Sequence, residues 1–145
     1  MRISEVLAGK ASQDVVSVTP DASVRELIGR LAEHNVGALV VSADGKSLDG
    51  IVSERDVVRR LHADEAILDA PVSSIMTSDV ATCEPSASVN ELMQIMTERR
   101  FRHIPVCSDG ALVGIISIGD VVKSRMSELE FERDQLDSYV HSSQT

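Results

Sequence analysis

VVSVTPDASVREL, residues Val15–Leu27, aligns with VATCEPSASVNEL, residues Val80–Leu92, at a constant offset of 65 residues, and this pair of segments decides the fold. Two further pairs follow in the same order, one at the same offset and one at an offset of 64: GALVVSADG (Gly37–Gly45) with RHIPVCSDG (Arg102–Gly110), and GIVSERDVV (Gly50–Val58) with GIISIGDVV (Gly114–Val122). Three blocks that keep their order and register indicate a tandem duplication.

Each copy is predicted to fold in the order β-α-β-β-α. A β-branched run before Thr19-Pro20 predicts a strand, the capping-box spacing Ser23-x-x-Glu26 predicts a helix start, and Asp44-Gly45 between two apolar runs predicts a hairpin. The first copy is expected to have strands at 15–18, 38–41 and 48–52 and helices from 24 to about 34 and from 53 to 61. The second is expected to have strands at 80–83, 103–107 and 112–116 and helices at 88–99 and from about 118.

Composition excludes several classes of protein. The 145 residues carry a formal net charge of −9, which disfavours contact with a phosphate backbone. Aromatic residues make up 2% of the chain, too few for the stacking surfaces of single-stranded nucleic-acid binders. No run approaches the roughly 18 apolar residues of a membrane span, and the N-terminus lacks a signal-peptide core. We therefore expect a soluble, cytoplasmic protein that binds neither nucleic acid nor membrane.

The size of each copy favours a paired architecture. A unit of roughly 50–60 residues buries only a marginal core by itself. We expect the two copies to pair about a pseudo-two-fold axis, so that the apolar faces of both sheets are buried together in one α+β double domain. A long C-terminal helix follows, because neither Gly nor Pro occurs after Asp120.

The second copy, VSSIMTSDVATCEPSASVNEL followed by RFRHIPVCSDGALVGIISIGDVVK, resembles a CBS domain, and SERDVVRRL carries the same pattern in the first copy. The chain as a whole is similar to a tandem CBS pair, or Bateman module, of the stand-alone bacterial or organellar type. The resemblance implies CBS repeats at 8–66 and 72–128, followed by a helical extension and tail at 129–145. It also implies two adenosine-binding clefts between the repeats and no catalytic activity.

Each repeat ends in the motif G-h-h-S-x-x-D, where h is apolar. The motif places Ser53 and Asp56 in the first copy, and Ser117 and Asp120 in the second, at the start of a predicted helix. A serine followed three residues later by an acid is also a capping box, which stabilises a helix without any ligand. Alternatively, a strand-to-helix turn exposes amide N–H groups that suit a phosphate, and its carboxylate can accept both hydroxyls of a ribose. The two roles are compatible.

In CBS pairs each cleft combines the S-x-x-D motif of one repeat with the first strand of the other. The resemblance therefore implies one site built from Ser53, Arg55, Asp56, Val80, Ala81 and His103. It implies a second site built from Ser117, Gly119, Asp120, Val15, Val16, Gly37 and Arg102. Lys10 and Thr77, each just before a first strand, are expected to border these sites. Aliphatic residues would hold the adenine: Val15, Val36, Ile51 and Ile115.

A basic cluster distinguishes the copies. The cluster is Arg99-Arg100-Phe101-Arg102-His103, in an otherwise acidic chain. Arg99 and Arg100 are expected to meet the dipole at a helix C-terminus, whereas Arg102 and His103 open the next strand and are expected to face the ligand. The first copy has Gly37 and Ala38 at the equivalent positions, so the two clefts cannot be equivalent.

Catalytic and metal-binding interpretations find no support in the motifs. The chain has no G-x-S-x-G, Walker or H-E-x-x-H pattern, and its two cysteines, Cys83 and Cys107, show no paired metal spacing and lie in predicted strands. His34, His62 and His141 are expected on helix surfaces or in the tail.

The predicted function is a non-enzymatic sensor whose regulatory ligand is AMP, ADP, ATP, NAD or S-adenosylmethionine and which acts on an unidentified regulated protein. The alternative is a ligand-free structural or interaction homodimer. We expect a homodimer for two reasons. Apolar residues of the last helix follow a near-heptad spacing, which Arg133 interrupts, and CBS pairs commonly dimerise through their helices. The apolar residues at this spacing are Val122, Met126, Leu129, Leu136 and Val140.

Overall fold

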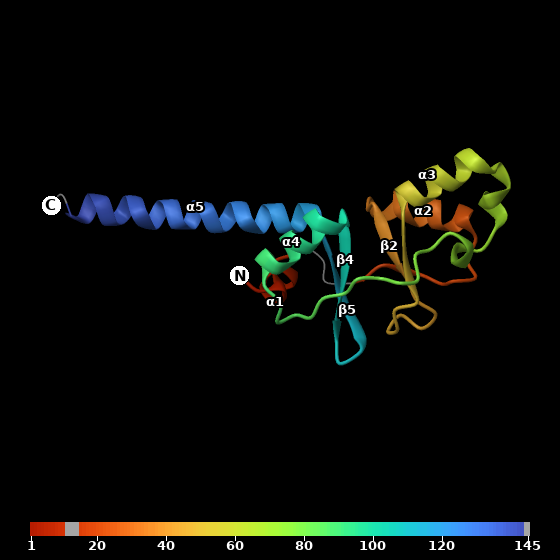
Figure 1. Cartoon of the computed structure of the whole chain (residues 1–145), viewed down its shortest axis with the longest axis horizontal. Coiled ribbons are helices and arrows are strands. Elements are labelled where there is room, and N and C mark those ends of the chain that lie inside the picture. The colour runs from red at the N-terminus through yellow and green to blue at the C-terminus, as the bar shows by residue number, and fades with distance from the viewer. Residues whose placement is uncertain (11–14, 144–145) are drawn as a thin grey trace.

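The computed structural model describes residues 1–10 and 15–143, and it places two small sheets between two groups of helices. Helices α2 and α3 lie at one end, α1, α4 and α5 lie at the other, and the sheets face each other in the middle (Figure 1). A hydrogen bond from the Leu112 N–H to the Lys46 carbonyl, 2.9 Å long, joins the two halves. Within the described residues, no helix is long and apolar enough to cross a bilayer.

The first repeat contains a three-stranded sheet in the order β1-β2-β3. Its elements are β1 (Ser17–Val18), α2 (Val24–His34), β2 (Ala38–Val41), β3 (Gly50–Ser53) and α3 (Glu54–Ala63). Strand β1 runs parallel to β2, and β2 runs antiparallel to β3. The predicted caps are present, since the Ser23 hydroxyl accepts a hydrogen bond from the Glu26 N–H and begins α2. The prediction of a strand from residue 15 is too long, because β1 begins at Ser17.

The second repeat follows the same path with a weaker first strand. Its elements are α4 (Val89–Arg99), β4 (His103–Ser108), β5 (Ala111–Ser117) and α5 (Ile118–Ser143). The strand predicted at 80–83 is wrong, because only an isolated parallel bridge joins Cys83 to Val106. Pro105 stands where the first repeat has Val40, which pairs with Ser17. A proline has no N–H to donate to the sheet, which accounts for the reduced pairing.

Each repeat is completed by the segment that lies before the other repeat in the chain. Helix α1 (Ile3–Ala8) attaches to the second repeat, where Arg2 forms an antiparallel bridge with Ser88. In the first repeat, the equivalent bridge joins Pro71 to Ser23, after the 3₁₀ turn η1 (Glu65–Asp69) and before η2 (Val72–Ser74). Sequence reasoning did not predict α1 or these 3₁₀ turns.

The glycine that opens each G-h-h-S-x-x-D motif makes room for these added segments. A Cβ atom on Gly50 would lie 2.7 Å from the Thr77 carbonyl oxygen, and one on Gly114 would lie 2.6 Å from the Leu7 side chain. Both distances are shorter than real Cβ atoms adopt. The motif therefore begins with glycine because the segment at 75–77 and helix α1 cross these strands closely.

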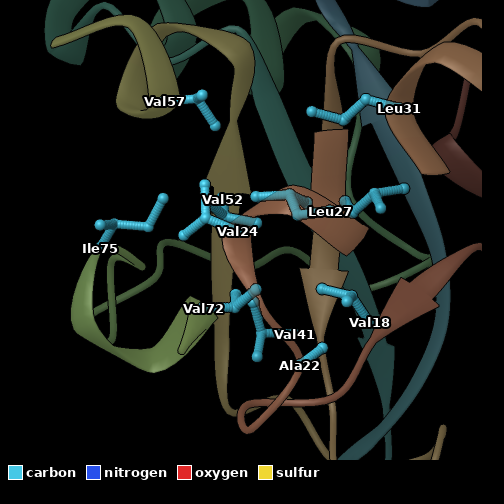
Figure 2. Close-up of a cluster of buried hydrophobic side chains, with 11 residues drawn as sticks. Val18, Ala22, Val24, Leu27, Leu31, Val41, Val52, Val57, Val72 and Ile75 are labelled. Carbon is cyan, nitrogen blue, oxygen red and sulfur yellow. The ribbon is translucent and has the colours of Figure 1, made fainter. Parts of the chain in front are cut away.

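The buried apolar residues form two clusters, one in each repeat. The first includes Val24 and Leu27 of α2, Val52 of β3, and Val72 and Ile75 from the connecting segment (Figure 2). The second is built in the same way from α4, β4 and β5, and is completed from α1. Each repeat thus completes its apolar core with a segment from outside the repeat.

Candidate functional site

The first S-x-x-D motif lies where β3 passes into α3. The Ser53 N–H and hydroxyl donate to the Asp56 carboxylate at 2.9 and 3.1 Å, and the Asp56 N–H donates to the Ser53 hydroxyl at 3.3 Å. These bonds form the capping box that sequence spacing predicted. Both side chains also line a cavity, so capping and ligand contact are geometrically compatible.

The first cavity, of about 610 Å³, lies between the repeats. Its lining from the first repeat is Gly37, Ala38, Ile51, Ser53, Glu54, Arg55, Asp56, Val58 and Arg59, and its lining from the rest of the chain is Thr77, Asp79, Val80, Ala81, Arg100, Phe101, Arg102 and His103. The structure therefore brings together all the residues assigned to the first site, together with Thr77. Gly37 and Arg102 were assigned to the other site, but they line this cavity, because the start of β2 and the residue before β4 meet at this opening.

Four arginines face the first cavity: Arg55, Arg59, Arg100 and Arg102. Among the ion pairs of the described residues, none involves these guanidinium groups. They outnumber the three carboxylates of the lining, so the cavity is a local basic region in a chain of net charge −9. Free guanidinium groups at a cavity wall suit a phosphate or another oxyanion.

Sequence reasoning missed two of these arginines. Arg59 follows Arg55 by one turn of α3, and this i, i+4 spacing is the signal that could have found it. Arg100 was expected to meet the helix dipole. Instead it ends α4 in the left-handed conformation, with φ of 60°, and lines the cavity. The position of the Arg100 side chain could not be predicted from the local sequence pattern. It depends on how the chain reverses direction at the end of α4, and this in turn depends on where β4 begins.

The aspartate of the second S-x-x-D motif is paired with a lysine from outside the motif, whereas the aspartate of the first has no such partner among the described residues. The Ser117 N–H donates to the Asp120 carboxylate at 2.9 Å and the Asp120 N–H donates to the Ser117 hydroxyl at 3.1 Å. The Lys10 ammonium lies 3.0 Å from the same carboxylate oxygen and also donates to the Ile115 carbonyl at 2.9 Å. Burial opposes ionisation, but the Ser117 N–H and Lys10 outweigh it and hold the pKa of Asp120 below its ordinary value.

A second cavity, also of about 610 Å³, surrounds this ion pair. It is lined by Met1, Glu5, Val6, Gly9, Lys10, Val16, His34, Val36, Ala38, Leu39, Ile115, Asp120, Lys123, Ser124 and Ser127. Of the residues assigned here, Lys10, Val16 and Asp120 line the cavity, whereas Val15, Ser117 and Gly119 do not. Gly119 instead lies in a shallow groove on α5.

The aliphatic residues expected to hold an adenine divide between the two cavities. Val36 and Ile115 line the second, and Ile51 lines the first. His34 was expected on a plain helix surface but lies at the wall of the second cavity.

Lys10 and Asp79 occupy equivalent positions beside the two cavities. Arg2 and Pro71 form the equivalent bridges of the two repeats, and Lys10 and Asp79 each lie eight residues after one of them. The two cavities therefore carry opposite charges at equivalent positions.

His103 lines the first cavity at the start of β4. Its side chain lines the first and approaches Gly37, where an added Cβ would lie 3.6 Å from His103 Cε1. Burial is the main cause that lowers the pKa of His103, with Asp120 acting in the opposite direction and Lys10 lowering it further. Charged groups of the second cavity therefore affect the pKa of His103, although its side chain lines the first.

The cysteines have the environment of small apolar residues. Cys83 is buried and Cys107 is half-buried, and both are free thiols. Burial raises the pKa of the Cys83 thiol to about 11 and that of Cys107 above its ordinary value. Such thiols are poor nucleophiles at neutral pH.

Two repeats that enclose paired cavities, each with an S-x-x-D motif at a strand-to-helix turn, define a CBS-domain pair. The CBS domain family matches residues 3–63 and 72–127, and the chain belongs to this family. The first matched range includes helix α1, although α1 packs on the second repeat in space.

Several known proteins are similar over most of the chain. The mitochondrial CBS domain-containing protein CBSX3 of Arabidopsis thaliana is 36% identical over 95% of this chain and 71% of its own length. The crystal structure of the CBS-domain containing protein ATU1752 from Agrobacterium tumefaciens has a TM-score of 0.82 and 44% identity, covering 86% of this chain and 99% of that one. CBSX2, solved in complex with AMP, has a TM-score of 0.73 and 26% identity, covering 87% of this chain and 96% of that one.

Proposed function

We propose that the protein is a regulatory module that binds an adenosine-containing ligand, with the phosphate of an adenine nucleotide held in the first cavity. The observation that carries the proposal is the juxtaposition, in one cavity, of the Asp56 carboxylate with four arginines without ion-pair partners among the described residues. The carboxylate suits the two hydroxyls of a ribose, and the guanidinium groups suit phosphate oxygens.

The apolar part of the wall supports adenine as the base. Ile51 and Val80 come from the two repeats and line the same cavity. Adenine would be held between aliphatic side chains, which fits a chain with only three aromatic residues. CBSX2 in complex with AMP supports an adenine nucleotide as the ligand class.

The second cavity favours an adenosine ligand with less negative charge. Its Asp120 carboxylate is already paired with Lys10, and Gly119 replaces the arginine that the first motif carries at position 55. Fewer free cations remain to hold a phosphate. We therefore expect AMP, ADP, ATP or NAD to prefer the first cavity, and a neutral or cationic ligand such as S-adenosylmethionine to prefer the second.

The proposed role is regulatory rather than catalytic. A ligand between the repeats contacts both at once, so it stabilises the relative arrangement of the repeats that closes on it. A protein partner that contacts both repeats would then sense the bound ligand through this change in population. The runner-up, a ligand-free structural protein, is favoured only by the capping boxes, which hold both motifs in place without a ligand.

Isothermal titration calorimetry with AMP, ADP, ATP, NAD and S-adenosylmethionine tests the proposal. We expect sub-millimolar binding of at least one nucleotide, lost from the first cavity in Asp56→Ala and retained there in Asp120→Ala. If none of these ligands binds below 1 mM, the sensor proposal fails for this panel. If nucleotide binding survives both substitutions, the ribose assignment is wrong.

A further inference from the structure

The mouth of the first cavity carries exposed basic and exposed apolar side chains together. They come from two short segments, one turn of α3 and the connection from α4 to β4. All six line the cavity and are exposed, and we call them the basic rim: Arg55, Val58, Arg59, Arg100, Phe101 and Arg102. Asp56 and His103 of the same cavity are half-buried, so the rim is the more accessible part of the wall.

The rim places apolar side chains among its cations. On α3, Val58 lies on the same face as Arg55 and Arg59, because steps of three and four residues bring side chains to one side of a helix. In the connection, Phe101 lies between two arginines. Val58 is 66% exposed and Phe101 is 36% exposed. A phosphate gains nothing from these two side chains, whereas arginine and aromatic residues are enriched where proteins contact each other.

The backbone of the rim is fixed by hydrogen bonds that involve no ligand. The Glu54 N–H at the start of α3 donates to the Gly37 carbonyl at 3.0 Å, and the Ile118 N–H donates to the Arg102 carbonyl at 2.8 Å. Arg100 ends α4 in the left-handed conformation. The four guanidinium groups take part in no ion pair of the described residues. The rim is therefore a preformed surface whose cations are available to a partner.

The charge of the whole chain limits the kind of partner. The formal net charge of −9 includes the four arginines of the rim, so the rest of the chain is more acidic still. A long polyanion such as a nucleic acid would extend from the rim onto a surface that repels it. A short acidic segment of a protein ends within the rim, and apolar residues among its acids can contact Val58 and Phe101.

We propose that the basic rim docks an acidic segment of a partner protein, whose carboxylates pair with the four arginines and whose apolar side chains pack on Val58 and Phe101. Helix α3 belongs to the first repeat and the α4–β4 connection to the second, so the segment contacts both repeats. The arginines are also those assigned to the ligand phosphate, so the segment and an adenine nucleotide compete for them. This competition, unlike the docking itself, rests on the function proposed above.

Fluorescence anisotropy with the full chain tests the docking. The probe is a short labelled peptide in which glutamates alternate with leucines, and we expect it to bind at micromolar concentration. Arg59→Ala should weaken binding about tenfold, because a charge-assisted contact is lost. Arg60→Ala is the matched control, because Arg60 is exposed on the same helix but does not line the cavity, and it should leave binding unchanged. A probe that does not bind below about 1 mM, or equal effects of the two substitutions, would overturn the proposal.

The apolar contacts and the kind of occupant are tested separately. Phe101→Ser should weaken binding of the leucine-containing probe about fivefold and leave circular dichroism unchanged, while a probe with serine in place of leucine binds both chains equally. Single-stranded RNA of similar length that binds more tightly than the peptide would contradict a protein partner. Self-association in sedimentation velocity that Arg59→Ala abolishes would assign the rim to a second copy of the chain and also contradict the proposal.

Competition with AMP separates this inference from the proposed function. Saturating AMP should release the bound peptide, because both use the same guanidinium groups. If calorimetry shows AMP binding but the peptide stays bound, the shared rim is wrong and the proposed function stands. If AMP does not bind and the peptide does, the proposed function fails and the docking surface stands.

Discussion

The two cavities have the same volume, about 610 Å³, and their motifs come from one duplicated pattern, yet they surround their aspartates differently. In the first, Asp56 is bonded only to Ser53 among the described residues, and it faces a wall that holds four arginines. In the second, Asp120 is also bonded to Lys10. Duplication thus preserved the turn that presents the carboxylate, whereas divergence beside it changed which ligand charge each cavity suits.

The difference arises from residues both outside and inside the motif. Lys10 and Asp79 occupy equivalent places on the two borrowed segments, and Arg55 and Gly119 occupy equivalent places inside the motifs. A cation in place of an acid, and a glycine in place of an arginine, change the charge beside each S-x-x-D motif. Four substitutions can break or sharpen this contrast.

The largest effect is expected from Asp56→Ala. Removal of the carboxylate takes away the proposed acceptor for two ribose hydroxyls, and we expect about a hundredfold loss of AMP affinity at the first cavity. The change also removes half of a capping box and should lower the free energy of unfolding by about 1 kcal/mol. Calorimetry and urea denaturation measure the two effects.

Ser23→Ala is the matched control for capping. Its hydroxyl caps α2 through the Glu26 N–H, and it does not line the first cavity. We expect a similar loss of stability with unchanged AMP affinity. If Ser23→Ala weakened AMP binding as much as Asp56→Ala does, the Asp56 effect would be one of stability alone.

Arg55→Ala should reduce AMP affinity about tenfold, because one charge-assisted contact to phosphate is lost. The loss should be smaller at high salt, where exposed charges are screened. Arg60→Ala changes the same helix outside the cavity and should leave AMP affinity unaltered. Equal effects of the two substitutions in a calorimetric titration would show that Arg55 acts only through overall charge.

Lys10→Met should increase the affinity of the second cavity for adenosine about threefold, because the Asp120 carboxylate is released to accept ribose hydroxyls. The pKa of Asp120 should rise, since the ammonium no longer favours the charged form. Lys46→Met, on the exposed hairpin, provides the control. A fall in adenosine affinity on Lys10→Met would show that Lys10 itself holds the ligand.

The smallest effect concerns pH. The pKa of His103 in the folded chain lies below the ordinary value near 6.5. As pH falls, the imidazole is therefore protonated in the unfolded chain before it is protonated in the folded chain. This difference lowers the stability of the fold below about pH 6.5. A phosphate in the first cavity favours the imidazolium. Binding of AMP at pH 6 should therefore take up protons, which calorimetry in buffers of different ionisation enthalpy detects.

His103→Gln should remove the contribution of this side chain to proton uptake while AMP still binds. Because the ligand phosphate also titrates near pH 6, the difference between the two chains is the informative quantity. Identical proton uptake in both chains would mean that the ligand phosphate does not approach His103.

Local features were predictable from sequence. The N-cap serines of α2 and α4, the hairpin at Asp44-Gly45 and the start of α3 at Ser53 depend on residues within a few positions of each other. The six residues that the resemblance to CBS pairs assigned to the first site, Ser53, Arg55, Asp56, Val80, Ala81 and His103, all line the first cavity.

Features that depend on distant segments were not predictable. Lys10 reaches Asp120 across 110 residues of chain, and α1 completes the core of the second repeat rather than the first. Gly37 and Arg102 line the first cavity although the resemblance assigned them to the second, because the start of β2 and the residue before β4 meet at its opening. A strand was predicted at 80–83 from the β-branched pattern of that segment. Pro105 of the neighbouring strand β4 has no N–H to pair with it, and only the bridge from Cys83 to Val106 forms.

A two-dimensional amide NMR titration with AMP tests the central contrast most directly, because it reports both cavities in one experiment. We predict that the signals of Ser53, Arg55 and His103 shift at the lowest AMP concentrations, and that those of Lys10 and Asp120 shift only at concentrations about tenfold higher. Signals of the second cavity that shift first, or signals of both cavities that shift together, would contradict the account.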